Sequence, residues 1–141
     1  MTKQTLAIEK IDLDSNGTHL LVETELTNEK TFFILDTGAS KSVIDNALLT
    51  HIEHTKIETD DLQSSHISGM IAGEIIEIPH LHFNTFSCPD FQALAMSLEH
   101  INTLYKEFTN KPISGLLGGD FFNTYNAEIN YKTNTITLEV Q

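Results

Sequence analysis

The chain has 141 residues, with 8 lysine or arginine residues against 20 aspartate or glutamate residues and a net charge of −12 at pH 7. This length fits one domain, expected to span residues 1–141, and the 40% hydrophobic content is enough for a core, which argues against a disordered chain. Nucleic acid and anionic membranes are bound by clustered cationic side chains, which are scarce here. We therefore expect neither nucleic acid nor a membrane as a partner.

The N-terminal segment and the single cysteine bear on the cellular compartment. The first ten residues contain no apolar core of a signal peptide, and Cys88 has no second cysteine with which to form an intrachain disulfide. No apolar run approaches the roughly eighteen residues of a membrane span. We expect a cytoplasmic protein with a reduced thiol.

The N-terminal part of the chain is predicted to consist mainly of short strands. Apolar and β-branched runs alternate with turn residues, and Asn16-Gly17 favours a hairpin with a two-residue turn, because both residues tolerate a positive φ. Asp45 is expected to cap a short helix over residues 46–50. The expected strands cover residues 6–8, 11–13, 19–26, 31–35 and 42–44, and residues 51–65 form a surface segment with room for a short strand.

The C-terminal part is predicted to add strands and the best helix candidate. Apolar residues recur with a helical period between Leu98 and Phe108, and Pro112 closes that segment. Glycines within an apolar stretch predict a mobile hairpin at 67–74 and an apolar turn at 115–119. Strands are expected at 75–78, 81–83 and 91–96, a short helix at 120–125, and a closing hairpin from 127–131 and 135–140. Many short strands with one or two short helices predict an all-β fold, a small closed barrel.

Asp36 is the strongest candidate for catalytic chemistry. It follows the apolar run 32–35 and is followed by Thr37 and Gly38. Asp-Thr-Gly alone occurs by chance in roughly three chains per hundred of this length, and an ordinary turn at a strand end is its simplest alternative. Two features favour a site: the strand before Asp36 is apolar enough to be buried, and Gly-Leu-Leu-Gly-Gly-Asp-Phe-Phe follows at 115–122.

These motifs, in this order and with the glycine-bearing segment between them, resemble the single-domain retropepsin-like aspartic proteases. The resemblance covers nearly the whole chain, from Leu6 to Val140, and is nearest to the bacterial subgroup, in which an apolar-Asn-Tyr strand such as 129–131 follows the second motif. It implies an acid-protease barrel of retropepsin type. It also implies an aspartic endopeptidase that acts on a peptide or protein substrate.

The resemblance also assigns roles to individual residues. Asp36 would be the catalytic carboxylate, supported in its loop by Thr37, Gly38, Ala39 and Ser40. The implied flap comprises Ile67, Ser68, Gly69, Met70, Ile71, Ala72 and Gly73, with Ile71 at its tip. The second motif, which would pack behind the catalytic loop and line subsites, comprises Leu116, Leu117, Gly118 and Asp120.

The chemistry of this family needs two carboxylates that share one proton. The chain has one Asp-Thr-Gly and is too short for two lobes, so the second Asp36 is expected from another copy in a two-fold homodimer. Asp120 is the alternative partner within the chain, but the resemblance places it at the opening of a helix. The alternative function is a catalytically silent peptide-binding or dimerisation module, since Ser40 and Gly119 replace an Asp-Arg pair of the retroviral members.

The other reactive side chains have simpler interpretations. Seven histidines are present, but no spacing supplies the three or four ligands of a zinc site, so we expect neither a metal nor a cofactor and solvent-exposed histidines. Cys88 is expected to be a packing or surface thiol. Phe108 is expected on the packed face of the helix, and Tyr131 and Val140 in the core.

Overall fold

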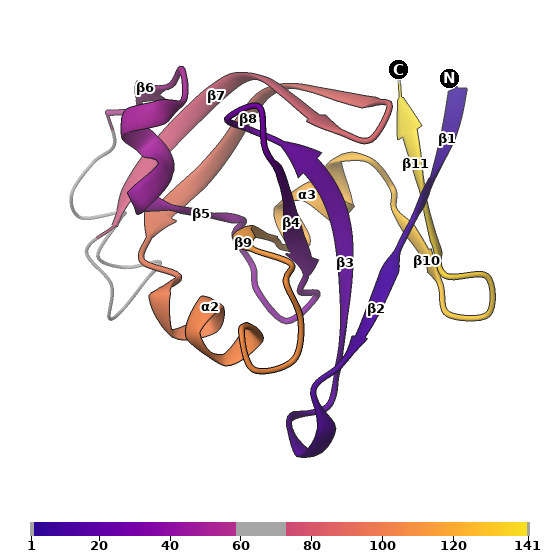
Figure 1. Cartoon of the computed structure of the whole chain (residues 1–141). Helices are drawn as coiled ribbons and strands as arrows, with labels where there is room; N and C mark the ends of the chain where they lie inside the picture. Colours follow the sequence, from indigo (N-terminus) through magenta and orange to yellow (C-terminus); the bar gives the residue numbers. More distant parts are fainter. Residues whose placement is uncertain (1, 59–72, 141) are drawn as a thin grey trace.

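The structure, a computed structural model, describes residues 2–58 and 73–140. Strands predominate, and the helical segments are short (Figure 1). The strands are β1 (Thr2–Ala7), β2 (Glu9–Asp12), β3 (Thr18–Glu25), β4 (Lys30–Leu35), β5 (Val43–Asp45), β6 (Thr55–Lys56), β7 (Glu74–Phe83), β8 (Phe86–Met96), β9 (Ile113–Leu117), β10 (Glu128–Asn130) and β11 (Thr135–Val140). The helical segments are the 3-10 turns η1 (Asp14–Asn16) and η2 (Asn46–His51) and the α-helices α2 (Glu99–Tyr105) and α3 (Gly119–Thr124).

Six strands close into a barrel, which confirms the predicted fold class. Their order is β3-β4-β9-β5-β8-β7, and the pairing of Thr24 in β3 with Phe83 in β7 closes the ring. β2 extends the sheet beside β3, and β6 extends it beside β7. A separate sheet has the order β1-β11-β10, so β11 is flanked on both edges by strands of its own chain (Figure 1).

β4 and β9 form a parallel pair that leads to the candidate site. Leu35 lies opposite Leu117 at the end of this pair, and β5 runs antiparallel along the other edge of β9. The predicted turn at 115–119 is therefore wrong for its first three residues, which belong to β9. Gly115 is small for a packing reason, because a Cβ there would lie 2.3 Å from Cε2 of the Phe33 ring and 2.5 Å from the Val43 carbonyl oxygen.

Side chains on both faces of β4 are buried, which explains its unbroken apolar sequence. Phe33 points into the barrel core and makes edge-to-face contacts with Phe83 and Phe91, at ring-centroid distances of 5.1 and 5.9 Å. Phe32 and Ile34 belong to a second cluster that is completed by α2 and its flanking residues. The expectation that a buried strand precedes Asp36 is confirmed.

Two turns differ from the sequence expectation. The β2–β3 hairpin exists, but its connection runs through η1, with positive φ values at Asp14 (φ 54°) and Gly17 (φ 88°). The strands predicted at 75–78, 81–83 and 91–96 are parts of two long strands. These are β7 and β8, joined by a tight turn that starts at Asn84 (φ 54°).

The C-terminal predictions hold in outline. α2 ends at Tyr105, so Phe108 lies beyond it and is 37% exposed, and Tyr131 is 66% exposed rather than in the core. The closing hairpin forms between β10 and β11, and Val140 packs against the core while partly buried. Asp45 caps η2 as predicted, its Oδ1 accepting the Ala47 N–H at 3.2 Å, and the short strand expected within 51–65 is β6.

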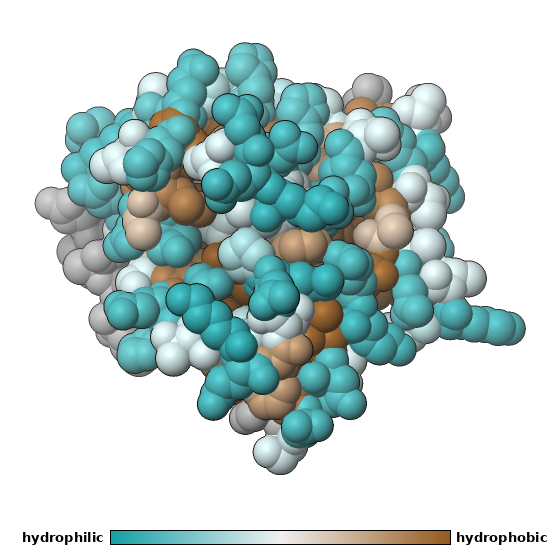
Figure 2. All heavy atoms as spheres, viewed as in Figure 1, coloured by the Kyte–Doolittle hydropathy of each residue, from teal (hydrophilic) through white to brown (hydrophobic). Residues whose placement is uncertain are grey.

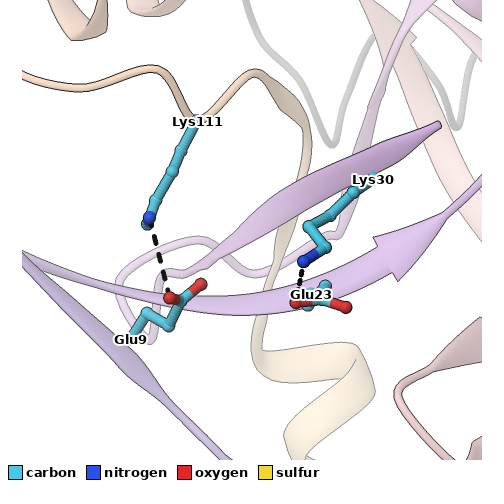
Figure 3. Close-up of polar contacts among 4 residues, drawn as sticks. All are labelled: Glu9, Glu23, Lys30 and Lys111. Atoms are coloured by element: carbon cyan, nitrogen blue, oxygen red, sulfur yellow. Dashed lines mark ion pairs between the residues drawn. The ribbon is translucent and has the colours of Figure 1, made fainter.

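The surface is mostly hydrophilic, with hydrophobic atoms in separate patches on the face shown in Figure 2. Two ion pairs join neighbouring segments (Figure 3): Lys111 Nζ lies 3.6 Å from Glu9 Oε1, and Lys30 Nζ lies 3.5 Å from Glu23 Oε1. Such exposed pairs stabilise a fold by about 1 kcal/mol or less each. Among the described residues no helix is long and apolar enough to cross a membrane.

Candidate active site

Asp36 lies one residue beyond β4, in a tight turn held by its own backbone. Its N–H donates to the Leu117 carbonyl at 2.9 Å, which extends the β4–β9 ladder by one bond. Its Oδ1 accepts the Gly38 N–H at 3.1 Å, and its carbonyl accepts the Ala39 N–H at 3.1 Å. The side chain is half-buried, so the turn presents a carboxylate of fixed orientation to the surroundings.

The second sequence motif lies directly against this turn. The Gly119 N–H donates to the Ala39 carbonyl at 2.7 Å, and the Asp120 N–H donates to the Ser40 carbonyl at 3.2 Å. A Cβ at Gly118 would lie 2.8 Å from the Ala39 oxygen and 2.9 Å from the carbonyl atoms of Lys41. Only a glycine permits this approach, so the two motifs are brought together as the sequence predicts.

The Asp120 side chain is turned inward, onto the segment that follows the Asp36 loop. Its Oδ1 accepts the Ser42 N–H at 3.0 Å, the Ser42 hydroxyl at 2.8 Å and the Phe121 N–H at 2.9 Å. The carboxylate thus binds one free amide at the start of α3, although Gly118 holds the capping position. Asp120 lies in the first turn of the helix, and its carboxylate ties α3 to the beginning of β5.

Ser42 is a member of this site that the sequence did not reveal. It is fully buried, and its Oγ also accepts the Gly118 N–H at 3.0 Å. In the sequence it is one of two serines that flank Lys41, with nothing to separate it from the exposed Ser40. Its role depends on the path of β9, which is set by long-range pairing.

The remaining predicted site residues have varied environments. Thr37 and Gly38 are exposed, Ala39 and Leu116 are half-buried, and Leu117 is buried. The predicted flap residues 67–72 lie outside the described residues. Gly73 is described, and a Cβ there would lie 2.6 Å from Cδ1 of Leu94, so this glycine lies closely against β8.

Two other reactive side chains, those of Cys88 and His19, pack against tyrosine residues. Cys88 is buried, which agrees with the prediction of a packing thiol rather than a surface thiol. Its Sγ lies 3.4 Å from the Tyr125 hydroxyl, and burial raises the pKa of the thiol. His19 is only partly exposed, because its Nδ1 lies 2.6 Å from the buried Tyr105 hydroxyl. Across residues 2–58 and 73–140, no three His, Cys, Asp or Glu side chains are grouped so that they could hold a metal ion.

Two solved structures are similar to this chain. The retroviral protease-like domain of Ddi1 from Leishmania major is 15% identical, covers 87% of this chain and 90% of its own, and superposes with a TM-score of 0.53. A retropepsin-like aspartic protease from Rickettsia conorii is 14% identical, covers 97% of this chain and 91% of its own, and has a TM-score of 0.49. Among curated proteins, none matches this chain.

The family match is broader than the two motifs. The family model described as aspartyl protease matches residues 22–121, which include β4, the Asp36 loop, β9 and the start of α3. This span covers more than half of the chain, and the barrel agrees with the fold of the Ddi1 domain. The chain belongs to the aspartyl protease family and has a retropepsin-like fold.

Proposed function

We propose that this protein is an aspartic endopeptidase that hydrolyses peptide bonds with a water activated by two Asp36 carboxylates, one from each protomer of a homodimer. The observation that carries the proposal is the placement of Asp36. Its carboxylate ends a strand buried on both faces, is held by the Gly38 amide, and remains half-exposed. Such a group is rigid enough for catalysis and open enough to reach a substrate.

The second carboxylate is proposed to come from another copy because Asp120 is already engaged. Three donors, two from Ser42 and one from Phe121, converge on its Oδ1. Turning this carboxylate toward Asp36 would leave a buried hydroxyl and buried amides without an acceptor, at about 1–3 kcal/mol each. A two-fold dimer supplies a second Asp36 without that cost, and two-fold dimers are the commonest assemblies.

The chemistry follows from the like charge of the two groups. Carboxylates about 3 Å apart cannot both ionise, so they share one proton. The charged carboxylate takes a proton from water as the water attacks the peptide carbonyl carbon, and the protonated one donates to the carbonyl oxygen. Gly38 has no side chain beside the carboxylate, whereas a Cβ at this position would lie 3.4 Å from Asp36 Oδ1.

Within this proposal the exposed Thr37 joins the two loops across the dimer axis, and residues 67–73 cover the bound peptide. Ser40 and Gly119 lack the ion pair that braces the retroviral members. Backbone bonds link the same two segments here, from Gly119 N–H to Ala39 O and from Asp120 N–H to Ser40 O. These bonds support a catalytic loop that holds its shape without the charged brace. We further propose that residues 1–141 act as one domain in the cytoplasm.

The test is cleavage of a diverse peptide library by the wild type and by Asp36→Asn, with sedimentation to verify the dimer. We expect the wild type to cleave and the variant to lose at least about a thousandfold in rate, because an amide cannot act as the general base. Asp14→Asn is the matched control: Asp14 is also exposed, and asparagine tolerates its positive φ of 54°.

The outcomes separate the two candidate functions. Cleavage that survives Asp36→Asn would contradict the proposed dyad. A verified wild-type dimer that binds peptides or a statine-type transition-state analogue but cleaves nothing would support the catalytically silent peptide-binding module. A strict monomer with activity would contradict the two-chain site.

A further inference from the structure

Ser42 lies behind the Asp36 loop, at the point where three segments of the chain meet. It is fully buried and precedes β5, and its own carbonyl accepts the Leu94 N–H of β8 at 2.9 Å. Its hydroxyl lies between two partners, Asp120 Oδ1 at 2.8 Å and the Gly118 N–H at 3.0 Å. One side chain therefore joins β5, the end of β9 and the start of α3.

The direction of both hydrogen bonds is fixed by chemistry. An ionised carboxylate only accepts, so the Ser42 hydroxyl proton points to Asp120. The backbone N–H of Gly118 only donates, so it must bond to the oxygen of that hydroxyl. The hydroxyl cannot rotate without breaking one of the two bonds; the bond to Gly118 is buried, and the bond to Asp120 is partly buried.

Gly118 connects the Ser42 hydroxyl to the loop that carries Asp36. The preceding residue, Leu117, accepts the Asp36 N–H at 2.9 Å, and the following residue, Gly119, donates to the Ala39 carbonyl at 2.7 Å. The two ends of the Asp36–Ala39 turn are thus held by the two neighbours of Gly118. Whatever fixes Gly118 fixes both ends of the catalytic loop.

We propose that Ser42 is a positioning residue, which orients the Asp36 carboxylate by fixing Gly118 with its hydroxyl. The inference rests on the proposed protease function for its kinetic consequence, but its structural content is independent of activity. Catalytic rates fall by up to about a hundredfold when reacting groups shift by 1 Å. Ser42→Ala is expected to lower kcat at least tenfold while KM changes little, because substrate contacts are retained.

Ser114 supplies a matched control. It is equally buried, at 1% exposed against 0% for Ser42, and its hydroxyl lies 2.7 Å from Thr31 Oγ1. It lies in β9, the strand that ends just before Gly118, but near the end remote from Asp36. Ser114→Ala removes a comparable buried hydrogen bond, so we expect similar destabilisation with kcat within twofold of the wild type.

The experiment compares kcat and KM of the wild type, Ser42→Ala and Ser114→Ala, at a temperature where all three are folded dimers. A selective fall of kcat in Ser42→Ala supports the positioning role. Equal falls in the two variants, or an unchanged kcat in Ser42→Ala, would overturn it.

Amide hydrogen exchange keeps the inference testable if no peptide is cleaved or if Ser42→Ala does not fold. In the wild type we expect the Gly118 and Gly119 amides to be protected as well as the strand amides of β9, and rapid exchange of Gly118 would overturn the proposal. Where both variants fold, Ser42→Ala should speed exchange at Asp36 and Gly119 at least tenfold, and Ser114→Ala should not. An inactive wild type with this exchange pattern would contradict only the proposed function.

Discussion

Hydrogen bonds of buried or half-buried polar side chains hold the parallel pair of β4 and β9 at both of its ends. The two ends differ in whether a carboxylate on a loop stays accessible. At the far end the hydroxyls of Thr31 and Ser114 bond to each other at 2.7 Å. At the site end the Ser42 hydroxyl and the Asp120 carboxylate bond to each other and to backbone amides. The site end adds Asp36, a half-exposed carboxylate on a loop, whereas the half-exposed Asp45 near the far end accepts the Ala47 and Leu98 amides.

A side chain of α2 strengthens the far end further. Asn102 Oδ1 accepts the Ile113 N–H at 2.8 Å, and its Nδ2 donates to the Ile113 carbonyl at 2.9 Å and the Leu98 carbonyl at 3.2 Å. These bonds give the beginning of β9 a partner of the kind that a neighbouring strand would supply. Hydrogen-bonded polar side chains therefore make both ends of the β4–β9 pair rigid. The site is distinguished by an accessible carboxylate on a loop that these bonds hold in place.

Among substitutions in the segments that hold the Asp36 loop, the largest effect is expected for Gly118→Ala. The φ of Gly118 is −106°, which any residue adopts, so the cost is steric: the new Cβ would meet backbone atoms of Ala39 and Lys41 at 2.8 and 2.9 Å. Backbone cannot yield as a flexible side chain can, so the Asp36 loop must move. We expect kcat/KM to fall at least about a hundredfold.

Gly119→Ala is the control for this prediction. Its Cβ would lie 3.5 Å from the Ala39 oxygen, an ordinary contact, so activity should stay within a few fold of the wild type. Equal losses in the two variants would contradict the steric explanation.

Asn102→Ala should affect stability without affecting catalysis. It leaves the Ile113 N–H without its acceptor and removes a side-chain donor from the Ile113 and Leu98 carbonyls, although the Leu98 carbonyl keeps the backbone N–H of residue 102; we expect a loss of about 1–3 kcal/mol in the free energy of unfolding. Chemical denaturation measures the loss, and Asn110→Ala at an exposed position is the control. A fall of kcat comparable to that of Ser42→Ala would remove the distinction between the two ends of β9.

Gly38→Ala, in contrast to Asn102→Ala, should affect catalysis with little effect on stability. The added methyl group would contact Asp36 Oδ1 at 3.4 Å, so the fold tolerates it, but it would lie against the carboxylate oxygen that accepts the Gly38 N–H. We expect kcat/KM to fall about tenfold with the free energy of unfolding changed by about 0.5 kcal/mol or less. A large loss of stability would show that Gly38 is needed for the turn rather than for access.

A smaller effect concerns alkaline pH and the cluster beside α2. Burial raises the pKa of Tyr105 from 10.0 to about 12, so the folded state holds the phenol proton more tightly than the unfolded state. The resulting stability is fully present below pH 10 and is lost as the pH rises toward 12. Denaturation across this range should show a weaker pH dependence in Tyr105→Phe; parallel profiles would contradict the assignment.

Sequence reasoning reached the parts of the molecule that local patterns determine. The apolar run into Asp36, the alternation of short strands and the two motifs sufficed for the barrel and for the candidate carboxylate. Prediction from the sequence failed where contacts between distant segments determine the local structure. Glycines at 115–119 indicate a turn locally, yet Gly115 is small because the Phe33 ring and the Val43 carbonyl lie against it in a strand.

The same limit applies to the polar side chains that hold the site. Ser42 and Asn102 act on partners 76 and 11 residues away along the chain, Gly118 and Ile113. Neither has a sequence signal of its own, because serine and asparagine are common surface residues. Their roles follow from the path of β9 and from burial, which only the three-dimensional arrangement shows.

The central claim, that one site needs Asp36 from two chains, is tested most directly by mixing subunits. Wild type and Asp36→Asn are combined at constant total concentration, allowed to exchange subunits, and assayed for peptide cleavage. If both carboxylates are required, activity follows the square of the wild-type fraction, about a quarter of the full value in an equal mixture. Activity that falls in proportion to the wild-type fraction, one half in the equal mixture, would show that each chain carries its own complete site and would contradict this account.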